Sequence, residues 1–141
     1  MERIIVGVDG SDSSRQALQW AVREARIREA ELEVVMAWRP PFVSGYPYAG
    51  IPFDPSEFER GARRSLDELV DAMDVTGIPK VERKLTLGDA AVTLLDAAKD
   101  ADLLVVGSRG RGGFTGLLLG SVSHHLAHHS PCPLVVVPHL E

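Results

Sequence analysis

Blocks of hydrophobic and polar positions along the chain predict a regular succession of strands and helices. Residues 4–8 and 32–38 are short, nearly continuous apolar runs, a pattern typical of strands that are covered on both faces. Between them, Ser11 is a candidate N-cap for a helix whose apolar residues recur on one face from Ala17 to Ala25. The chain is therefore expected to begin as strand, helix, strand.

The same alternation continues through the rest of the sequence. Three further helices are predicted from apolar periodicity, at residues 58–73, 88–98 and about 120–129. Three further strands are predicted at residues 80–87, 103–106 and 134–137. The first of these alternates between apolar and polar positions, as expected of an edge or half-exposed strand. Residues 39–55, rich in proline, form a long connection that is functional or mobile.

Strict alternation of strands and helices predicts parallel strands joined by right-handed crossovers. The expected fold is α/β, a single domain over residues 1–141 with a doubly wound five-stranded parallel sheet of order 3-2-1-4-5 and helices on both faces. Ligands of such sheets bind where the strand order reverses, here between strands 1 and 4. Asp9 and residues 107–110 follow those two strands, so the sequence predicts a binding crevice between them.

The stretch from Leu103 to Ser123 has the composition of an anion site. Six of the thirteen glycines lie between Gly107 and Gly120, where they would permit positive φ and expose backbone N–H groups. A helix beginning at Gly120 would add further N–H donors and the positive end of its dipole. Arg111 and its neighbour Arg109 would suit phosphate oxygens. The alternative is a surface loop whose glycines only form turns.

The distribution of charge agrees with an anionic ligand at this end of the chain. Residues 103–140 contain no Asp or Glu, whereas an even spread of the twenty acidic residues would place about five there. The whole chain has a net charge of −5, which argues against a general nucleic-acid binder. The predicted anion is phosphate.

Several familiar phosphate sites are absent. The sequence has no P-loop motif, and the G-x-G-x-x-G fingerprint that begins at Gly110 fails at Thr115. A phosphoacceptor receiver domain would need an Asp after strand 3 and a Lys after the last crossover. Here strand 3 is followed by Gly88, and no lysine follows Lys99.

Gly107, Gly110, Gly120 and Ser121 are spaced as in the motif G-x2-G-x9-G-[ST]. This spacing resembles that of the ATP-binding members of the universal stress protein family. The sequences VGVDGS at residues 6–11, SVS at 121–123 and HHSPCPLVVV at 128–137 also look like that family. The resemblance covers the whole chain and implies a fold similar to that of the adenine nucleotide alpha hydrolases.

The resemblance implies that the ligand is ATP, with Mg²⁺ at the phosphates. Asp9 would hold the ribose hydroxyls, Gly7 would lie beside the nucleoside, and the backbone at Ala37 and Trp38 would contact the adenine. The phosphates would be bound by the glycine-rich loop and the start of the fourth helix, namely Gly107, Ser108, Arg109, Gly110, Arg111, Gly112, Gly113, Gly120, Ser121, Val122 and Ser123. The family usually forms homodimers through its last strand, here residues 134–137.

Three functions follow as hypotheses. The first is a homodimeric, nucleotide-dependent regulatory module of the stress response, which acts on a protein partner. The second is an enzyme, a slow ATPase or autokinase; because the phosphate loop offers no acidic general base, we expect no enzyme. The third is a nucleotide-free interaction protein, against which the intact glycine spacing argues. Bulky replacements of Gly107, Gly110 or Gly120 are expected to abolish nucleotide binding and leave the fold intact.

Other features of the chain bear on metal binding and location. His124, His125, His128 and His129 form two i, i+4 pairs that could bind zinc together with Cys132, or could simply suit the end of a helix. We expect no metal site and a buried, unreactive thiol. The opening residues do not resemble a signal peptide, and no apolar run is long enough to span a bilayer. A cytoplasmic protein that contacts neither membrane nor nucleic acid is expected.

Overall fold

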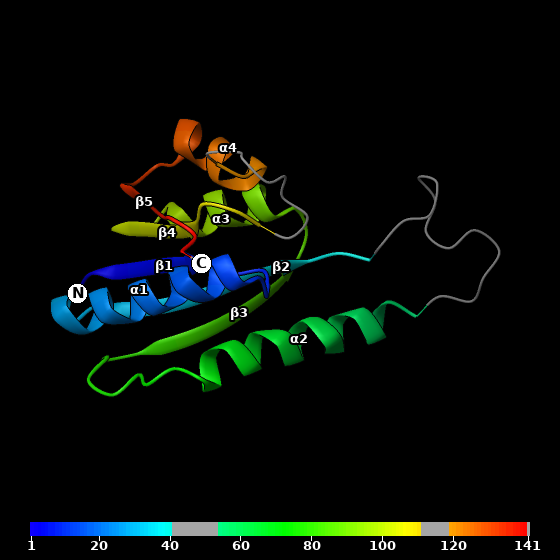
Figure 1. The fold of residues 1–141 in the computed structure, drawn as a ribbon, viewed down its shortest axis with the longest axis horizontal. Coiled ribbons are helices and arrows are strands. Elements are labelled where there is room, and N and C mark those ends of the chain that lie inside the picture. The colour runs from blue at the N-terminus through cyan, green and yellow to red at the C-terminus, as the bar shows by residue number, and fades with distance from the viewer. Residues whose placement is uncertain (41–53, 111–118, 141) are drawn as a thin grey trace.

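The computed structural model describes residues 1–40, 54–110 and 119–140. Its centre is a parallel sheet of five strands in the order β3-β2-β1-β4-β5 (Figure 1). The strands are β1 (Arg3–Gly7), β2 (Glu31–Trp38), β3 (Val81–Leu87), β4 (Leu103–Gly107) and β5 (Leu134–Val137). The predicted fold class and strand order are confirmed.

Four helices alternate with the strands along the described chain. They are α1 (Asp12–Arg28), α2 (Pro55–Asp71), α3 (Ala90–Ala98) and α4 (Ser121–His129). The first three begin at side chains that accept a hydrogen bond from the first helical turn, those of Ser11, Asp54 and Asp89. The fourth begins at Gly120, which has no side chain to offer. The predicted cap at Ser11 and the predicted start of the last helix are thus confirmed.

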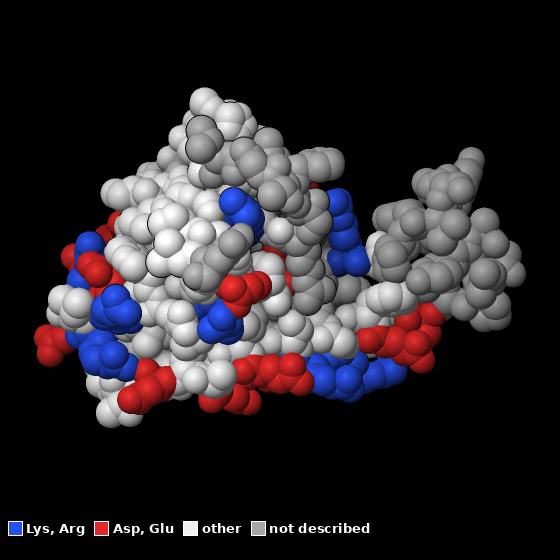
Figure 2. Space-filling model, in the orientation of Figure 1, with Lys and Arg blue, Asp and Glu red and all other residues white. Residues whose placement is uncertain are grey.

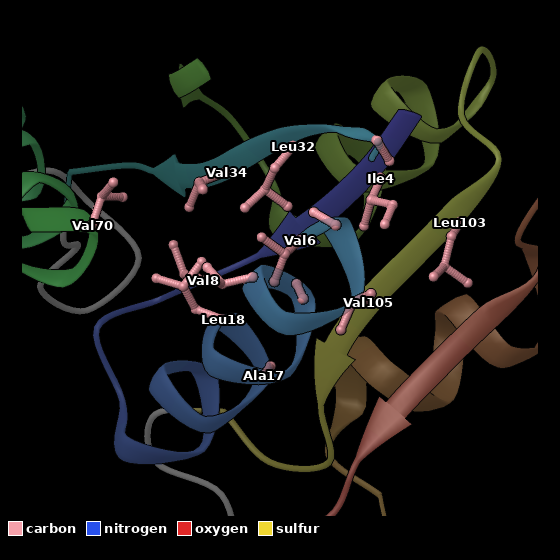
Figure 3. Packing of buried hydrophobic residues seen from close by; sticks show 14 of the residues in the cluster. Ile4, Val6, Val8, Ala17, Leu18, Leu32, Val34, Val70, Leu103 and Val105 are labelled. Atoms are coloured by element: carbon pink, nitrogen blue, oxygen red, sulfur yellow. The ribbon is translucent and has the colours of Figure 1, made fainter. Parts of the chain in front are cut away.

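The core consists of two apolar layers, one on each face of the sheet. On one face, α1 and α2 cover residues such as Val6, Val34 and Val105, and Val70 of α2 is buried in the same cluster (Figure 3). On the opposite face, α3 and α4 cover a second cluster that includes Ile5 and Leu104. Alternate residues of one strand enter opposite layers, which is why the central strands are continuous apolar runs.

The two outer strands differ from the central ones as predicted. β3 lies at one edge, where Val81 and Leu85 pack towards α2 and Arg83 between them donates hydrogen bonds to Asp67 and Asp71 of that helix. β5 lies at the other edge, and all four of its residues are half-buried. None of the helices in the described ranges combines the length and the apolar character needed to cross a membrane.

Candidate nucleotide-binding site

A cavity of about 590 Å³ lies beyond the carboxyl ends of β1 and β4, where the strand order reverses. Its volume is within the range of small-molecule sites. The described residues that line it are Gly7, Val8, Asp9, Ser14, Ala90, Leu94, Val106, Gly107, Arg109, Gly110, Leu119, Gly120, Ser121, Val122, Ser123 and His124. The structure thus brings the turn after β1, the loop after β4 and the start of α4 to one place, as the topology predicts.

Most of the predicted site residues belong to this lining. They are Gly7, Asp9, Gly107, Arg109, Gly110, Gly120, Ser121, Val122 and Ser123. Ser108, Ala37 and Trp38 are described by the structure but do not line the cavity. Arg111, Gly112 and Gly113, like the loop at 41–53, lie outside the described residues.

Asp9 is held in a tight turn between β1 and α1. Its Oδ1 accepts a hydrogen bond from the backbone N–H of Ser11 at 2.9 Å, and its own N–H donates to Ser14 Oγ at 3.2 Å. Gly10 between them has φ of +86°, a conformation that favours glycine. Because a carboxylate has about four acceptor positions, this turn contact is compatible with a further role in the cavity. Asp9 is both a structural part of its turn and a wall of the site.

The glycines of the motif allow close approach rather than positive φ. None of Gly107, Gly110 and Gly120 has φ between +20° and +160°, so these three glycines do not use the positive φ that glycine permits. A Cβ on Gly107 would lie 2.5 Å from Ser13 Oγ and 2.8 Å from the backbone oxygen of Ser13 in α1. The expectation that a bulky residue at Gly107 leaves the fold intact therefore does not hold, because β4 and α1 meet there.

The other two motif glycines face the site itself. A Cβ on Gly110 would lie 3.0 Å from Asp9 Oδ2, so this glycine keeps the loop after β4 close to the carboxylate. A Cβ on Gly120 would be 3.4 Å from the backbone of residues 108–110. These distances show that the loop lies close to the Asp9 carboxylate and in van der Waals contact with the start of α4.

The amino-terminal end of α4 is fixed by hydrogen bonds to the loop after β4. The N–H of Gly120 donates to the carbonyl of Ser108 at 2.6 Å, and the buried Ser123 hydroxyl lies 3.1 Å from the Gly120 carbonyl and 3.3 Å from that of Ser108. No side chain of the cap residue accepts from the first turn. The helix start therefore presents backbone N–H groups and its positive dipole end to the cavity.

Ser108 has a structural position rather than a place in the lining. It is 8% exposed, and its Oγ accepts from the N–H of His139 at 3.1 Å. The next residue, Leu140, exchanges two hydrogen bonds with the side-chain amide of Gln16 on α1. Ser108 thus joins the glycine-rich loop to the segment that follows β5, a role that no feature of the sequence indicated.

Ala37 and Trp38 extend β2 beyond the end of β1. Pairing with β1 ends at Val35, whose carbonyl accepts from the N–H of Val8, whereas the carbonyl of Trp38 accepts from Gly88 on the β3 side. Since backbone groups of alternate residues point to the same side of a strand, Ala37 presents its N–H and C=O to the side of β1, past the last paired residue. The predicted adenine contact thus has polar backbone groups near the crevice.

The charges around the cavity are few. Among the described lining residues Asp9 is the one carboxylate, and Arg109, half-buried, is the one residue with a permanent positive charge. In Figure 2 most charged side chains lie over α1 and α2, and the described surface over α4 is largely uncharged.

Sequence reasoning missed seven lining residues. Ala90 and Leu94 come from α3, and Val8, Ser14, Val106, Leu119 and His124 are neighbours of predicted positions. Leu94 lies against Gly7, where a Cβ would be 2.6 Å from its Cδ1. The α3 residues could not be found from a motif, because they reach the cavity only through the packing of α3 on the sheet.

The four histidines of α4 form two ring pairs on the exposed side of the helix, one edge to face and one tilted. The ring centroids of His124 and His128 are 4.8 Å apart, and those of His125 and His129 are 4.5 Å apart. Within the described ranges no group of three or more His, Cys, Asp or Glu residues is placed to hold a metal ion. Burial raises the pKa of the nearby Cys132 thiol above 9.0.

Comparisons of the sequence and of the structure with known proteins all find members of one family. The family model that matches, over residues 1–138, is described as "Universal stress protein family". A universal stress protein of Thermus aquaticus is 36% identical, with 95% of this chain and 96% of that protein covered. One of Mycobacterium tuberculosis is 34% identical over 95% of this chain, which spans only 46% of that relative's length.

Solved structures show the same architecture. A universal stress protein in complex with cAMP superposes with a TM-score of 0.74 at 29% identity, over 97% of this chain and 96% of that one. The fold, the spacing of the glycine motif and the sequence similarity over residues 1–138 therefore indicate the same family. The chain belongs to the universal stress protein family.

Proposed function

We propose that this chain binds an adenine nucleotide, ATP, in the cavity between β1 and β4. The observation that supports this most strongly is that the Asp9 carboxylate and the amino-terminal end of α4 line the same cavity. The Asp9 carboxylate suits the hydroxyls of a ribose, and the start of α4, whose cap residue has no side chain, suits phosphate. That a solved relative was obtained in complex with cAMP supports an adenine nucleotide as the ligand class.

In the proposed complex, each part of the nucleotide has its own contacts. Asp9 accepts from the ribose hydroxyls, and Gly7 and Leu94 form the apolar wall beside the nucleoside. The backbone of Ala37 and Trp38 contacts the adenine edge. The N–H groups of α4 from Ser121 to Ser123 and the Arg109 side chain bind the phosphates.

Mg²⁺ is proposed to accompany the phosphates. Asp9 is the one carboxylate among the described lining residues and is assigned to the ribose. The ion would therefore be held by phosphate oxygens and water, which is a common arrangement for this cation.

The proposed role is regulatory: the nucleotide state alters contacts with a protein partner during stress. We expect no dedicated catalysis, because Asp9, the one carboxylate of the described lining, is assigned to the ribose and is not free to act as a general base beside the phosphates. A homodimer is proposed to form along β5, whose half-buried apolar residues lie at an open sheet edge. Sedimentation should then give twice the chain mass of 15.3 kDa, and a monomer would contradict this part.

The first test is to denature the purified protein and identify any released nucleotide by chromatography and mass. About one ATP per chain would establish a retained ligand, whereas ADP would direct attention to turnover. Calorimetric titration with ATP, AMP and cAMP then gives affinities for the emptied protein. No nucleotide released and none bound would refute the proposal in favour of the interaction-only function.

A matched pair of variants tests the site. Asp9→Asn keeps an acceptor for the Ser11 N–H but removes the charge, and it should weaken ATP binding by at least about tenfold, the usual scale for losing hydrogen bonds to a charged group. Asp12→Asn removes the same charge from an exposed residue that does not line the cavity and should leave affinity unchanged. Equal affinities of the two variants would refute the assignment of Asp9.

A further inference from the structure

His124 has a position that the nucleotide motif does not explain. It lies in the first turn of α4, immediately after the Ser121-Val122-Ser123 segment, and is one of the residues that line the cavity. Its side chain is exposed, and its ring meets that of His128 edge to face at 4.8 Å. The other pair on the helix, His125 and His129, does not line the cavity.

The charged groups around His124 are few and can be named. Across the cavity lie Asp9 and Arg109. The described elements that pack against α4 are α3 and β5; α3 contains one ionisable residue, Asp96, which pairs with Lys99, and β5 contains none. On α4 itself the remaining titratable residues are the other three histidines. Among the described residues of α3, α4 and β5, Asp96 is therefore the one carboxylate, and it pairs with Lys99.

We propose that His124 is a further phosphate-contacting residue and that its protonation strengthens nucleotide binding as the pH falls from about 8 to about 6. Histidine is the side chain whose charge changes in this range. The inference rests on the proposed function, since it requires phosphate at the start of α4. A phosphate bound beside His124 would favour the charged form of the imidazole over the neutral form. Binding should therefore take up protons.

The experiment is calorimetric titration at about pH 6 and about pH 8 on the wild-type chain, His124→Asn and His125→Asn. ATP itself gains a proton near pH 6, so the comparison between variants, rather than the wild-type slope, is the measured quantity. The ratio of the affinities at the two pH values should be about fivefold larger for the wild type than for His124→Asn. This is less than the full effect of a hydrogen bond to a charged group, because the site is open to water. His125→Asn, an exposed residue outside the lining, should retain the wild-type ratio.

Two further readouts separate phosphate contact from a structural effect. Titration in buffers of different ionisation enthalpy should show proton uptake in the wild type that His124→Asn reduces. Adenosine, which has no phosphate, should bind with the same pH dependence to both. Repeating the comparison with cAMP removes the ligand's own titration, since its phosphodiester has no second proton to gain.

The outcomes distinguish the two proposals. If the wild type binds ATP and His124→Asn has the same affinity ratio and the same proton uptake, His124 has no such role and the proposed function stands. If His125→Asn lowers the ratio as much as His124→Asn does, the effect belongs to the general charge of the helix, and the assignment to His124 fails. If the wild type binds neither ATP nor cAMP at either pH, both proposals fail.

Discussion

Gly107 provides the most direct test of how the motif glycines act. In Gly107→Ala the new Cβ would lie 2.5 Å from Ser13 Oγ, 2.8 Å from the Ser13 backbone oxygen and 3.0 Å from its carbonyl carbon. A side-chain oxygen can rotate away, but the backbone of α1 can move only if the helix shifts away from β4. The same shift would lengthen the hydrogen bond from the Arg109 N–H to Ser13 Oγ, now 3.3 Å.

We expect Gly107→Ala to lower the free energy of unfolding by about 3 kcal/mol, the upper end of the usual cost of an overpacked core. For a chain of this length that corresponds to a melting temperature about 10 °C lower. Urea unfolding followed by circular dichroism measures it, with an unchanged m-value as evidence that the folded state remains compact. Gly61→Ala is the matched control, because nothing lies within 4 Å of its Cβ on the exposed side of α2.

The control should be more stable than the wild type by about 0.5–1 kcal/mol, since alanine is the better helix former. Gly110→Ala should separate stability from binding: its Cβ meets only the movable Asp9 carboxylate, so the fold should change little while ATP affinity falls. A Gly107→Ala protein that unfolds at the wild-type midpoint would refute the close contact between β4 and α1.

Three other predictions follow from the ionisable groups. Arg3→Ala should lower the free energy of unfolding by about 2 kcal/mol, because it removes the ion-pair partner of Glu33, whose side chain is only 5% exposed. The loss should be smaller than for a fully buried pair, since Arg3 itself is partly exposed. An unchanged midpoint of urea unfolding would contradict this prediction. Hydrogen bonds from Ser56 and Thr76 lower the pKa of the Asp54 and Asp74 carboxyls from their ordinary value. Their contribution to stability is therefore complete above the ordinary pKa and is lost as the pH falls through the lowered pKa. In urea unfolding, the free energy of unfolding of Asp54→Asn should fall less steeply than that of the wild type as the pH is lowered below about 4, and equal slopes would contradict this. Burial raises the pKa of the Cys132 thiol and so lowers the fraction of reactive thiolate. At about pH 7.5, iodoacetamide should therefore alkylate Cys132 in the folded protein at least about three times more slowly than in the urea-unfolded protein. Equal rates would contradict the burial of this thiol.

Most of the fold could be predicted from the sequence because its determinants are local. Continuous apolar runs such as residues 103–106 indicate buried parallel strands, and the strand order follows from alternation with right-handed crossovers. The helix start at Ser11 was predicted for the same reason, since a capping side chain acts within its own turn. The part of the site formed by the ends of β1 and β4 follows directly from this topology.

The rest of the site depends on contacts between distant segments, which no local pattern specifies. Leu94 reaches the cavity because α3 packs across the end of β1 against Gly7. From the sequence, Ser108 and Ser123 are equally good candidates for a hydroxyl that binds phosphate. In the structure one receives the N–H of His139 and the other lies against carbonyls of the loop. Only the folded chain distinguishes a hydroxyl that faces a ligand from one that fastens a loop.

The spacing of the glycine motif is best explained by three positions at which other parts of the chain lie close to the glycine Cα. The backbone of α1 lies against Gly107, the Asp9 carboxylate lies against Gly110, and the backbone of residues 108–110 lies against Gly120. The three contacts lie in different parts of the cavity wall, and only the one at Gly107 leaves no space for a Cβ beside backbone atoms. It follows that loss of binding in a Gly107 variant would reflect damage to the fold, whereas loss in Gly110→Ala would report on the site. Any functional study of the motif therefore needs a stability measurement beside each affinity.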